Sequence, residues 1–499
     1  MCLFVRMSHR PQKIAIIGSG VAALAAACRL AHAGHHLQVF EASEQPGGKL
    51  ISITSGDFRF DAGPSLFTLP AVLDDVFVSC GKNPRDYYQY HRKETICEYF
   101  FADGTHFTAP ADAATFAERA EHTFGVPQKK IIEYLEKSAR KYDSTAPIFL
   151  RKSLHKASTY FSKEVFSALK VLPQLGLLSH LHDENTRALG DERLTQLFDR
   201  YATYNGSSPF KTPGIMSMIP HLEMGIGTYF PEGGMISITR ALFQLAKDLG
   251  VQFEFNARVT SIEHHSKTLK GIRLGERFVP ANGVVCNMDV VAAYRKLLPD
   301  LPLPSKVAKA ERSSSGIIFY WGIRGHFPQL DLHNILFSGK YREEFASIFD
   351  HHTLCDDPTV YINISSKEEK SDAPEGCENW FVMINAPTNV GQDWDKLISA
   401  SRKNILEKIS RVLHCDISER IMCETVLDPR GIESRTSSLG GSLYGTSSNS
   451  RMAAFLRHPN FSKIKGLYFC GGSVHPGGGI PLCLYSAQIV AEVISEDIR

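Results

Sequence analysis

The chain of 499 residues is 43% hydrophobic, so it holds enough apolar side chain to bury several cores, and a wholly disordered protein is excluded. At roughly 150 residues per domain, we expect two to four domains. Lysine and arginine number 55 against 53 aspartate and glutamate residues, so no overall field attracts polyanions and we expect no nucleic-acid partner.

The cysteines and the apolar runs indicate where in the cell the protein is expected. The 11 cysteines form no CxxC pair, which favours reduced thiols in the cytoplasm. The apolar run 14–33 is broken by Gly18 and Gly20 and carries Arg29 and His32 near its end, so we expect no membrane span there.

A strand, a helix and a second strand open the chain. Residues 13–18 (KIAIIG) form a short run rich in β-branched residues that ends in a glycine turn. The alanine-rich stretch 21–33 predicts a helix that Gly34 stops, and LQVFE at 37–41 predicts the next strand. A unit of this length joins parallel strands by a right-handed crossover.

The rest of the chain alternates between strands and helices. We expect a hairpin around Asp103-Gly104 within 100–109, and then longer amphipathic helices from about 111 to 217. Later segments predict a helix within 229–250, strands at 251–263 and 278–290, a second sheet within 311–385, a helix at 394–413, and a final strand and helix at 466–472 and 482–495.

The turn after the first strand carries a dinucleotide-binding fingerprint. Gly18-Ser19-Gly20-Val21-Ala22-Ala23 matches GxGxxG/A between a strand and a helix, which is its required context. Gly18 permits the tight turn, and Gly20 lets the backbone approach a pyrophosphate at the helix N-terminus. Ala23 replaces the third glycine, and its single methyl group still permits close packing of helix on strand.

Glu41 ends the second strand, where it can accept hydrogen bonds from ribose hydroxyl groups. An acid at this position disfavours the 2′-phosphate of NADP. An ordinary βα turn would explain the glycines alone, but not the strand, helix and acid together. Nucleotide binding is therefore the better interpretation, with FAD and NAD still to be separated.

Four further segments distinguish FAD from NAD as the cofactor. They are PGGK at 46–49, FDAGPSLFT at 60–68, YNGSSPFKTPG with YFPEGGM at 204–235, and GLYFCGGSVHPGGGIP at 466–481. Through these segments the chain resembles the FAD-dependent amine oxidase superfamily, and within it the bacterial carotenoid desaturases of the phytoene desaturase family. Each segment alone is an ordinary turn. Their common order along nearly the whole chain favours FAD.

The resemblance implies flavin contacts for many residues. It places backbone of the PGGK turn and the DAGPS strand against the flavin, and Val259 against adenine. It also aims the N-terminus of the helix after Ile480 at the flavin, where it stabilises the negative charge of the reduced ring. The residues implied, beyond those of the fingerprint, are Gly47, Gly48, Lys49, Gly63, Pro64, Ser65, Val259, Gly471, Gly472, Ser473 and Ile480.

The implied fold is α/β, with a Rossmann-like FAD-binding domain interleaved with a mixed-sheet plus helical substrate domain. We expect residues 10–110, 225–300 and 455–499 to form the discontinuous FAD-binding domain. Residues 111–224 would form the helical, membrane-facing part of the substrate domain, and 301–454 its sheet and helix part.

The implied activity is desaturation of a carotenoid. A hydride leaves an allylic carbon for flavin N5, and a neighbouring carbon loses a proton. The stretches 199–224 and 58–70 look closest to the hydroxycarotenoid 3,4-desaturase branch, of the methoxyneurosporene dehydrogenase type, which acts on an end bearing a 1-hydroxy or 1-methoxy group. Phytoene desaturation, carotenoid isomerisation and retinol saturation are the alternatives.

No catalytic residue can be named from the sequence. His475, in the loop near the flavin, is a candidate acid or base, although an ordinary loop histidine explains it better. His221 and Glu223 could line the substrate cavity or be structural. The adjacent histidine pairs match no metal motif, so we expect no metal.

Residues 150–182 combine basic with apolar side chains at helical spacing. Seen alone, the segment slightly favours a helix of the substrate domain packed on its own core. Because a carotenoid substrate dissolves in bilayers, we nevertheless expect it to contact the inner face of the membrane peripherally. The electron acceptor, a quinone or oxygen, is left open.

Two rival classes remain. Rab escort and GDP-dissociation-inhibitor proteins share this fold as prenyl-protein binding modules, but the intact glycines, Glu41 and the C-terminal loop disfavour them. A soluble amine oxidase should present an aromatic cage beside the flavin, and the sequence identifies none.

Overall fold

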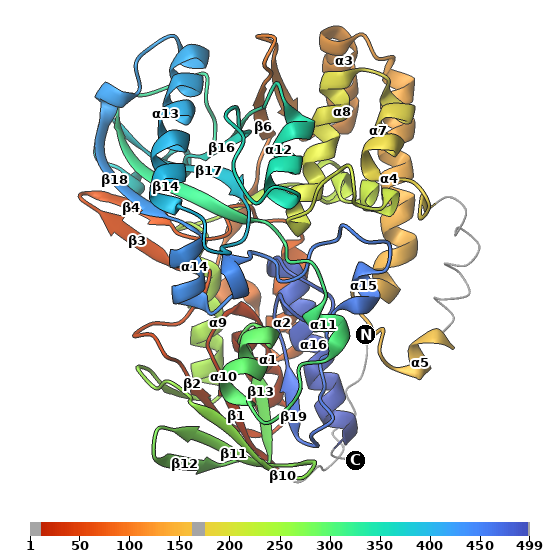
Figure 1. The fold of residues 1–499 in the computed structure, drawn as a ribbon, viewed down its shortest axis with the longest axis vertical. Helices are drawn as coiled ribbons and strands as arrows, with labels where there is room; N and C mark the ends of the chain where they lie inside the picture. Colours follow the sequence, from red (N-terminus) through yellow and green to blue (C-terminus); the bar gives the residue numbers. More distant parts are fainter. Residues whose placement is uncertain (1–10, 162–174, 498–499) are drawn as a thin grey trace.

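The computed structural model describes residues 11–161 and 175–497. The molecule is elongated, with a small parallel sheet and its helices in the lower half of Figure 1 and a larger sheet beside a group of helices in the upper half. Segments from both ends of the chain meet in the lower half. The predicted α/β class, with interleaved segments, is confirmed.

The lower half is built on a five-stranded parallel sheet. Its strand order is β19-β13-β1-β2-β9, with bounds Leu467–Phe469, Gly283–Cys286, Lys13–Ile17, His36–Phe40 and Gln252–Glu254. Helix α1 (Val21–His32) packs against α9 (Ile236–Asp248) and α16 (Ile480–Asp497). Because neighbours cover α1 on every side, Val21 to Cys28 are all buried, which explains its alanine-rich sequence.

The upper half holds a seven-stranded sheet that is mixed, since only β15 and β6 pair in parallel. Its order is β18-β14-β17-β16-β15-β6-β7, with bounds Ile421–Leu427, Ser315–Arg324, Cys377–Ala386, Val360–Asn363, His333–Leu336, Thr95–Phe100 and His106–Pro110. Strands β6 and β7 form the hairpin predicted around Asp103-Gly104. They belong to this sheet although they lie within 10–110, a range predicted for the FAD-binding domain. That range therefore contributes to both sheets, and the domain division stays a prediction.

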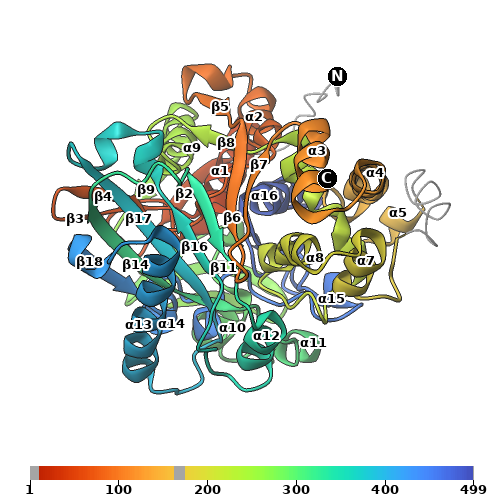
Figure 2. The same ribbon diagram turned by 90° about the horizontal axis from the view of Figure 1, so that it is seen from above.

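Helices stand beside this sheet. Figure 2 shows α3, α4, α7 and α8 grouped on one side of it, with β6 and β7 between. Their aromatic and aliphatic side chains share one core with β6, β7 and β15. The bounds are α3 Ala113–Phe124, α4 Gln128–Phe149, α5 Ala157–Tyr160, α7 Leu181–Leu189 and α8 Glu192–Asp199, followed by the short turns η3 Arg200–Asn205, η4 Gly214–Met218 and η5 His221–Ile226.

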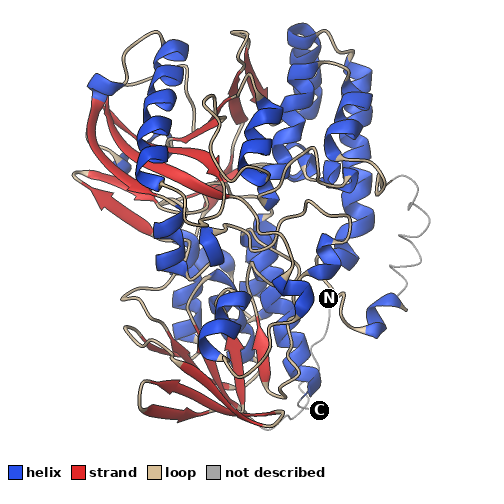
Figure 3. Ribbon diagram, viewed as in Figure 1, coloured by secondary structure: helices blue, strands red, loops and turns tan. Residues whose placement is uncertain are grey.

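The remaining elements connect these layers, and Figure 3 shows them by type. The strands are β3 Ser52–Ser55, β4 Phe58–Asp61, β5 Tyr90–Arg92, β8 Tyr229–Pro231, β10 Ser261–His265, β11 Thr268–Leu274 and β12 Arg277–Pro280. The helices are α2 Pro70–Ser79, α10 Val290–Leu297, α11 Ser305–Ala308, α12 Tyr341–Phe349, α13 Trp394–Leu413, α14 Pro429–Thr436 and α15 Ala453–Leu456. Single 3-10 turns are η1 Pro84–Asp86, η6 Ser365–Lys367, η7 Lys370–Asp372, η8 Ser418–Arg420 and η9 Leu439–Gly441.

Two predicted strand regions differ from the structure. Within 251–263, β9 and β10 belong to different sheets, because the chain turns at Asn256 with φ 54° and runs without strand pairing to Thr260. Val259 therefore lies in a connection rather than in a strand. Within 311–385, α12 interrupts the strands, since YREEFASIF places Phe345 and Ile348 at helical spacing on a buried face.

Among the described residues, no helix combines the length and the hydropathy needed to cross a membrane.

Candidate functional site

A cavity of about 830 Å³ runs from the carboxyl ends of β1 and β2 to the seven-stranded sheet. Its volume lies within the usual range for cofactor and ligand sites. It is lined by every residue predicted to bind the cofactor except Ala23: Gly18, Ser19, Gly20, Val21, Ala22, Glu41, Gly47, Gly48, Lys49, Gly63, Pro64, Ser65, Val259, Gly471, Gly472, Ser473 and Ile480.

The turn from β1 to α1 brings the N-terminus of the helix to this cavity. Gly18 adopts φ 88°, a conformation that favours glycine, and its N–H donates to Phe40 O at 2.8 Å. Gly20 is the N-cap of α1, and no side chain caps the helix there. The first turn also carries no acid. The helix end therefore offers backbone donors and the positive end of its dipole to an anion.

Glu41 organises this turn. Its Oε2 accepts hydrogen bonds from the backbone N–H and the hydroxyl of Ser19, both at 2.7 Å. Its Oε1 accepts from the N–H of Ser43 at 2.8 Å. The carboxylate thus holds the glycine turn to the end of β2, the position at which the fingerprint predicts a ribose contact.

The predicted glycine segments are crowded by backbone. A Cβ on Gly48 would lie 3.3 Å from Gly20 Cα, and one on Gly63 would lie 1.8 Å from Lys49 O. Three segments separated in sequence therefore approach within backbone contact along one wall of the cavity. A flat or extended cofactor can lie against such a wall, so the residues present fit a dinucleotide.

Lys49 brings a cation to the cavity. Its Nζ donates to Leu443 O at 2.8 Å and to Ser442 O at 3.1 Å. Burial lowers the pKa of the amine to about 8, although the nearby Asp289 carboxylate opposes the shift. Lys49 is one of the residues for which the family resemblance implies a flavin contact.

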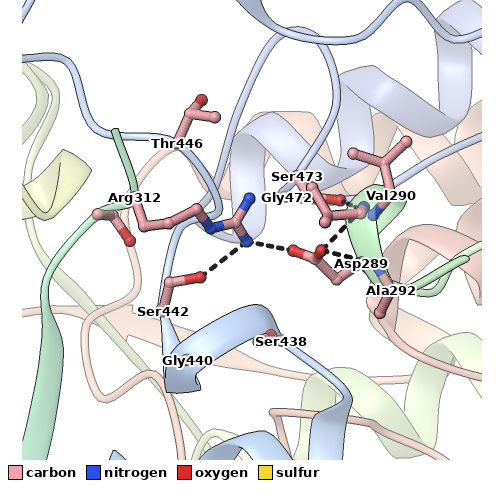
Figure 4. Close-up of polar contacts among 12 residues, drawn as sticks. Asp289, Val290, Ala292, Arg312, Ser438, Gly440, Ser442, Thr446, Gly472 and Ser473 are labelled. Carbon is pink, nitrogen blue, oxygen red and sulfur yellow. Dashed lines mark hydrogen bonds and ion pairs between the residues drawn. The ribbon is translucent and has the colours of Figure 1, made fainter. Parts of the chain in front are cut away.

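Asp289, which lines the cavity, forms an ion pair with Arg312 (Figure 4). Asp289 Oδ2 accepts from Arg312 Nη2 at 2.5 Å, and its Oδ1 caps α10 by accepting from Val291 N at 3.0 Å. The same nitrogen of Arg312 donates to Ser442 Oγ at 2.9 Å. Sequence reasoning missed this pair. The Asp before VVAAYRKL is a readable N-cap signal, whereas nothing local marks Arg312.

The far end of the cavity is polar. Glu223, on η5, is 1% exposed, and its Oε2 accepts from Arg200 Nη2 at 2.5 Å and from Tyr201 OH at 2.6 Å. Arg200 also donates through Nε to Tyr99 OH at 2.8 Å. Arg200 and Glu223 both line the cavity, and Glu223 is also satisfied by this pairing, so a contact of Glu223 with substrate stays a prediction.

A second polar chain reaches the same end from the sheet. Ser65, one of the predicted flavin contacts, hydrogen-bonds Tyr361 OH at 2.8 Å, and Tyr361 OH hydrogen-bonds His333 Nδ1 at 2.8 Å. Burial, with Lys93 and Arg200 nearby, lowers the pKa of His333 to about 3, so the ring is neutral at physiological pH. Ser65, Tyr361 and His333 all line the cavity.

Three predicted positions lie outside the cavity lining. Ala23 is fully buried in the core beneath α1, where it fills the packing role assigned to the third fingerprint position. His475 is buried, with its Nε2 2.8 Å from Lys152 O, and burial lowers its pKa to about 4, so the ordinary loop histidine is the better interpretation. His221 packs on Tyr142. In the described ranges, no group of three metal-ligating side chains occurs.

The family model of the flavin-containing amine oxidoreductases matches residues 21–495 of this chain. The chain belongs to this family. The flavin enzyme is therefore an oxidoreductase with FAD as its cofactor, as the fingerprint and the four further segments predicted.

Individual proteins resemble this flavin enzyme along nearly its whole length. A 1-hydroxycarotenoid 3,4-desaturase from Flavobacterium sp. (strain P99-3) is 53% identical, covering 97% of this chain and 99% of that protein. A 4,4′-diapolycopene oxygenase from Methylomonas sp. is 31% identical, covering 99% and 100%. The solved structure of an oxidoreductase from Methanosarcina mazei shares the fold with a TM-score of 0.62 at 16% identity, covering 96% and 100%.

Proposed function

We propose that this flavin enzyme is a carotenoid desaturase that introduces the 3,4 double bond into a 1-hydroxycarotenoid. The observation that carries the proposal is the 53% identity, over 97% of the chain, to a protein described as a 1-hydroxycarotenoid 3,4-desaturase. The second support is a cavity that extends from the dinucleotide turn into the other half of the molecule.

The proposed reaction removes two hydrogens from neighbouring carbons. FAD, when bound, accepts the hydride from one carbon, and the other carbon loses a proton as the C=C bond forms. The residues of the chain then need only bind and orient a long apolar molecule and exclude water from the reacting end. Phe381 and Met383, from β17, supply apolar wall for that purpose.

The FAD contacts belong to the same proposal. Free N–H groups at the start of α1 would bind the pyrophosphate, and Glu41 would bind the adenosine ribose. Val259 would contact adenine. The turns at Gly47–Lys49, Gly63–Ser65 and Gly471–Ser473, with the start of α16 at Ile480, would surround the flavin.

Substrate comparison tests the activity. Purified FAD-loaded protein is incubated in separate reactions with a 1-hydroxycarotenoid and with phytoene, and the absorbance maximum of each extracted pigment is recorded. A red shift with the hydroxylated substrate is expected, because the conjugated system lengthens. Conversion of phytoene alone would replace the proposal with phytoene desaturation, and protein stripped of FAD is the control.

We also propose peripheral contact with the inner face of the membrane through exposed apolar side chains at 160–161 and 177–178. Phe161 and Leu178 are 82% and 80% exposed, and Tyr160 and Leu177 are also exposed. Figures 1 and 2 both place α5 at the edge of the molecule, away from both sheets. The predicted segment 150–182 includes these side chains, but its residues 162–174 lie outside the described ranges. Large apolar side chains exposed to this degree are typical of an interaction surface.

Flotation with vesicles of phosphatidylcholine and phosphatidylglycerol tests this contact. Phe161→Ser combined with Leu178→Ser should shift protein from the vesicle fraction to the free fraction. Val390→Ser, which removes a residue 66% exposed elsewhere, is the matched control and should float like the unchanged protein. Equal flotation of all three proteins would contradict the proposal.

The electron acceptor is proposed to be a membrane quinone or oxygen, since FAD must be reoxidised after each desaturation. Turnover measured anaerobically with and without an added quinone separates the two acceptors. Turnover restored by quinone alone would assign the membrane carrier.

A further inference from the structure

The polar far end of the cavity is unusual for an enzyme with an apolar substrate. A hydrocarbon chain offers no hydrogen bonds, so each polar group buried against it loses its contacts with water. Yet Arg200, Tyr204, Glu223, His333 and Tyr361 all line this end. The wall here matches a ligand that carries a polar group.

Three of these side chains have unused hydrogen-bonding capacity. Both hydrogen bonds to Glu223 from described residues fall on Oε2, which leaves Oε1 as a free acceptor. Tyr204 OH and His333 Nε2 are buried and have no partner among the described residues. Buried polar atoms without partners are uncommon in folded proteins, and ligand binding is one way in which they are satisfied.

The tautomer of His333 follows from its neighbours. Asn363 Nδ2, which can only donate, lies 3.2 Å from His333 Nδ1. Nδ1 therefore accepts, and the neutral ring carries its proton on Nε2. The far end thus combines a carboxylate acceptor with an N–H donor and a tyrosine hydroxyl, which together suit an alcohol because an alcohol both donates and accepts.

The position of this polar end matches the proposed reaction. In a 1-hydroxycarotenoid the hydroxyl group is only two carbons from the bond to be desaturated, so its subsite must be close to the flavin. The hydrogen-bonded chain from Ser65 through Tyr361 to His333 joins a proposed flavin contact directly to this end. Lys93 and Arg200 also lie within electrostatic reach of His333.

We infer that Glu223, Tyr204 and His333 form the subsite that binds the tertiary hydroxyl group of the substrate. Glu223 Oε1 accepts the hydroxyl hydrogen, and His333 Nε2 or Tyr204 OH donates to its oxygen. Arg200 and Tyr201 hold Glu223 in place through Oε2. Sites that bind a hydroxyl in this way reject analogues that lack it, because their own buried groups are then left unpaired. The inference rests on the proposed function and adds the residues that select the substrate.

A comparison of two substrates tests it. FAD-loaded unchanged protein, Glu223→Gln and Tyr204→Phe are assayed with a 1-hydroxycarotenoid and with the same carotenoid lacking the hydroxyl group. Glu223→Gln should lower kcat/KM for the hydroxylated substrate at least tenfold, mainly through KM, and change kcat/KM for the other less than threefold. Tyr204→Phe, which removes only an unpartnered hydroxyl, should act in the same direction with a smaller loss.

The control is Glu98→Gln, since Glu98 is also a buried carboxylate of the upper half but does not line the cavity. It should leave the selectivity between the two substrates unchanged. Flavin absorbance of each variant verifies that the protein is folded and loaded, and Tyr204→Phe carries the test if Glu223→Gln does not fold.

Equal losses on both substrates in Glu223→Gln, or selectivity unchanged in the folded variants, would overturn the inference. Equal losses would instead give Glu223 a role common to both reactions, such as accepting the proton. An unchanged protein that desaturates both substrates equally well would overturn the inference and keep the desaturase activity. An unchanged protein that converts neither substrate would contradict the proposed function itself.

Discussion

Ser19 donates both its backbone N–H and its hydroxyl group to Oε2 of Glu41. The acid at the end of β2 is therefore part of the glycine turn as well as a predicted ribose ligand. A change at either residue disturbs the backbone that should receive the pyrophosphate.

Glu41→Ala should weaken FAD binding by about 10- to 100-fold, because hydrogen bonds to a charged group contribute about 1.5–3 kcal/mol each. The dissociation constant is measured by titrating apoprotein with FAD and following flavin fluorescence. Glu118→Ala, at an exposed position of α3, is the control. Unchanged flavin affinity in Glu41→Ala would falsify the assignment of the nucleotide site.

Gly63→Ala should lower both the apparent Tm and the flavin content of purified protein. Its new Cβ would lie 1.8 Å from Lys49 O, and backbone on both sides must move to make room. Gly283→Ala is the matched control, because the atom nearest to its Cβ would be Ile14 Cγ1 at 3.4 Å, and Gly466 O would lie 3.8 Å away, both ordinary van der Waals contacts. Thermal unfolding of the two variants, followed by flavin fluorescence, should separate them clearly, and equal Tm values would contradict the crowding.

Lys49 should make the stability of the apoprotein depend on pH. Its folded-state pKa is lowered from 10.5 to about 8, so below pH 8 the folded protein bears the cost of a buried charge. Between pH 8 and pH 10.5 the folded state releases this proton before the unfolded state does, and the cost disappears. The unchanged protein should therefore gain stability relative to Lys49→Met as the pH rises through this window. Urea unfolding at pH 7 and pH 10 measures the difference, and a difference that stays constant argues against the shift.

The Asp289–Arg312 pair should contribute to stability more through Asp289 than through Arg312. Removing either partner of a buried ion pair costs about 3 kcal/mol or more, because the other charge is left unpaired. Asp289 also caps α10, so Asp289→Ala loses the cap in addition. Urea unfolding of Asp289→Ala, Arg312→Met and the double variant should show costs that do not add. Additive costs would mean that the two side chains act independently.

Local sequence predicted several elements in both halves of the molecule. The run KIAIIG, the glycine turn and the alanine-rich helix correspond to β1 and α1, whose observed bounds differ by a residue or so from those predicted. The hairpin at Asp103-Gly104 and the helix at 394–413 were likewise found. These elements depend on periodicity, turn residues and caps, all of which are local properties.

Other features could not be read from local sequence. The turn at Asn256 divides the strand predicted at 251–263 between two sheets, and the pairing of β6 with β15 brings together residues more than 200 positions apart. Nothing near Arg312 signals its partner Asp289. Glu223 could be named as a cavity residue or a structural one, and only the tertiary structure showed that it lines the cavity while paired with Arg200.

The amino-acid order by itself determined the dinucleotide turn, its acid and the flavin family, because these depend on short motifs whose backbone geometry is set by neighbouring residues. Tertiary structure alone decided which polar side chains share the far end of the cavity. Arg200, Glu223, His333 and Tyr361 come from separate elements, and their hydrogen-bonding capacity becomes meaningful only when folding buries them together against one space.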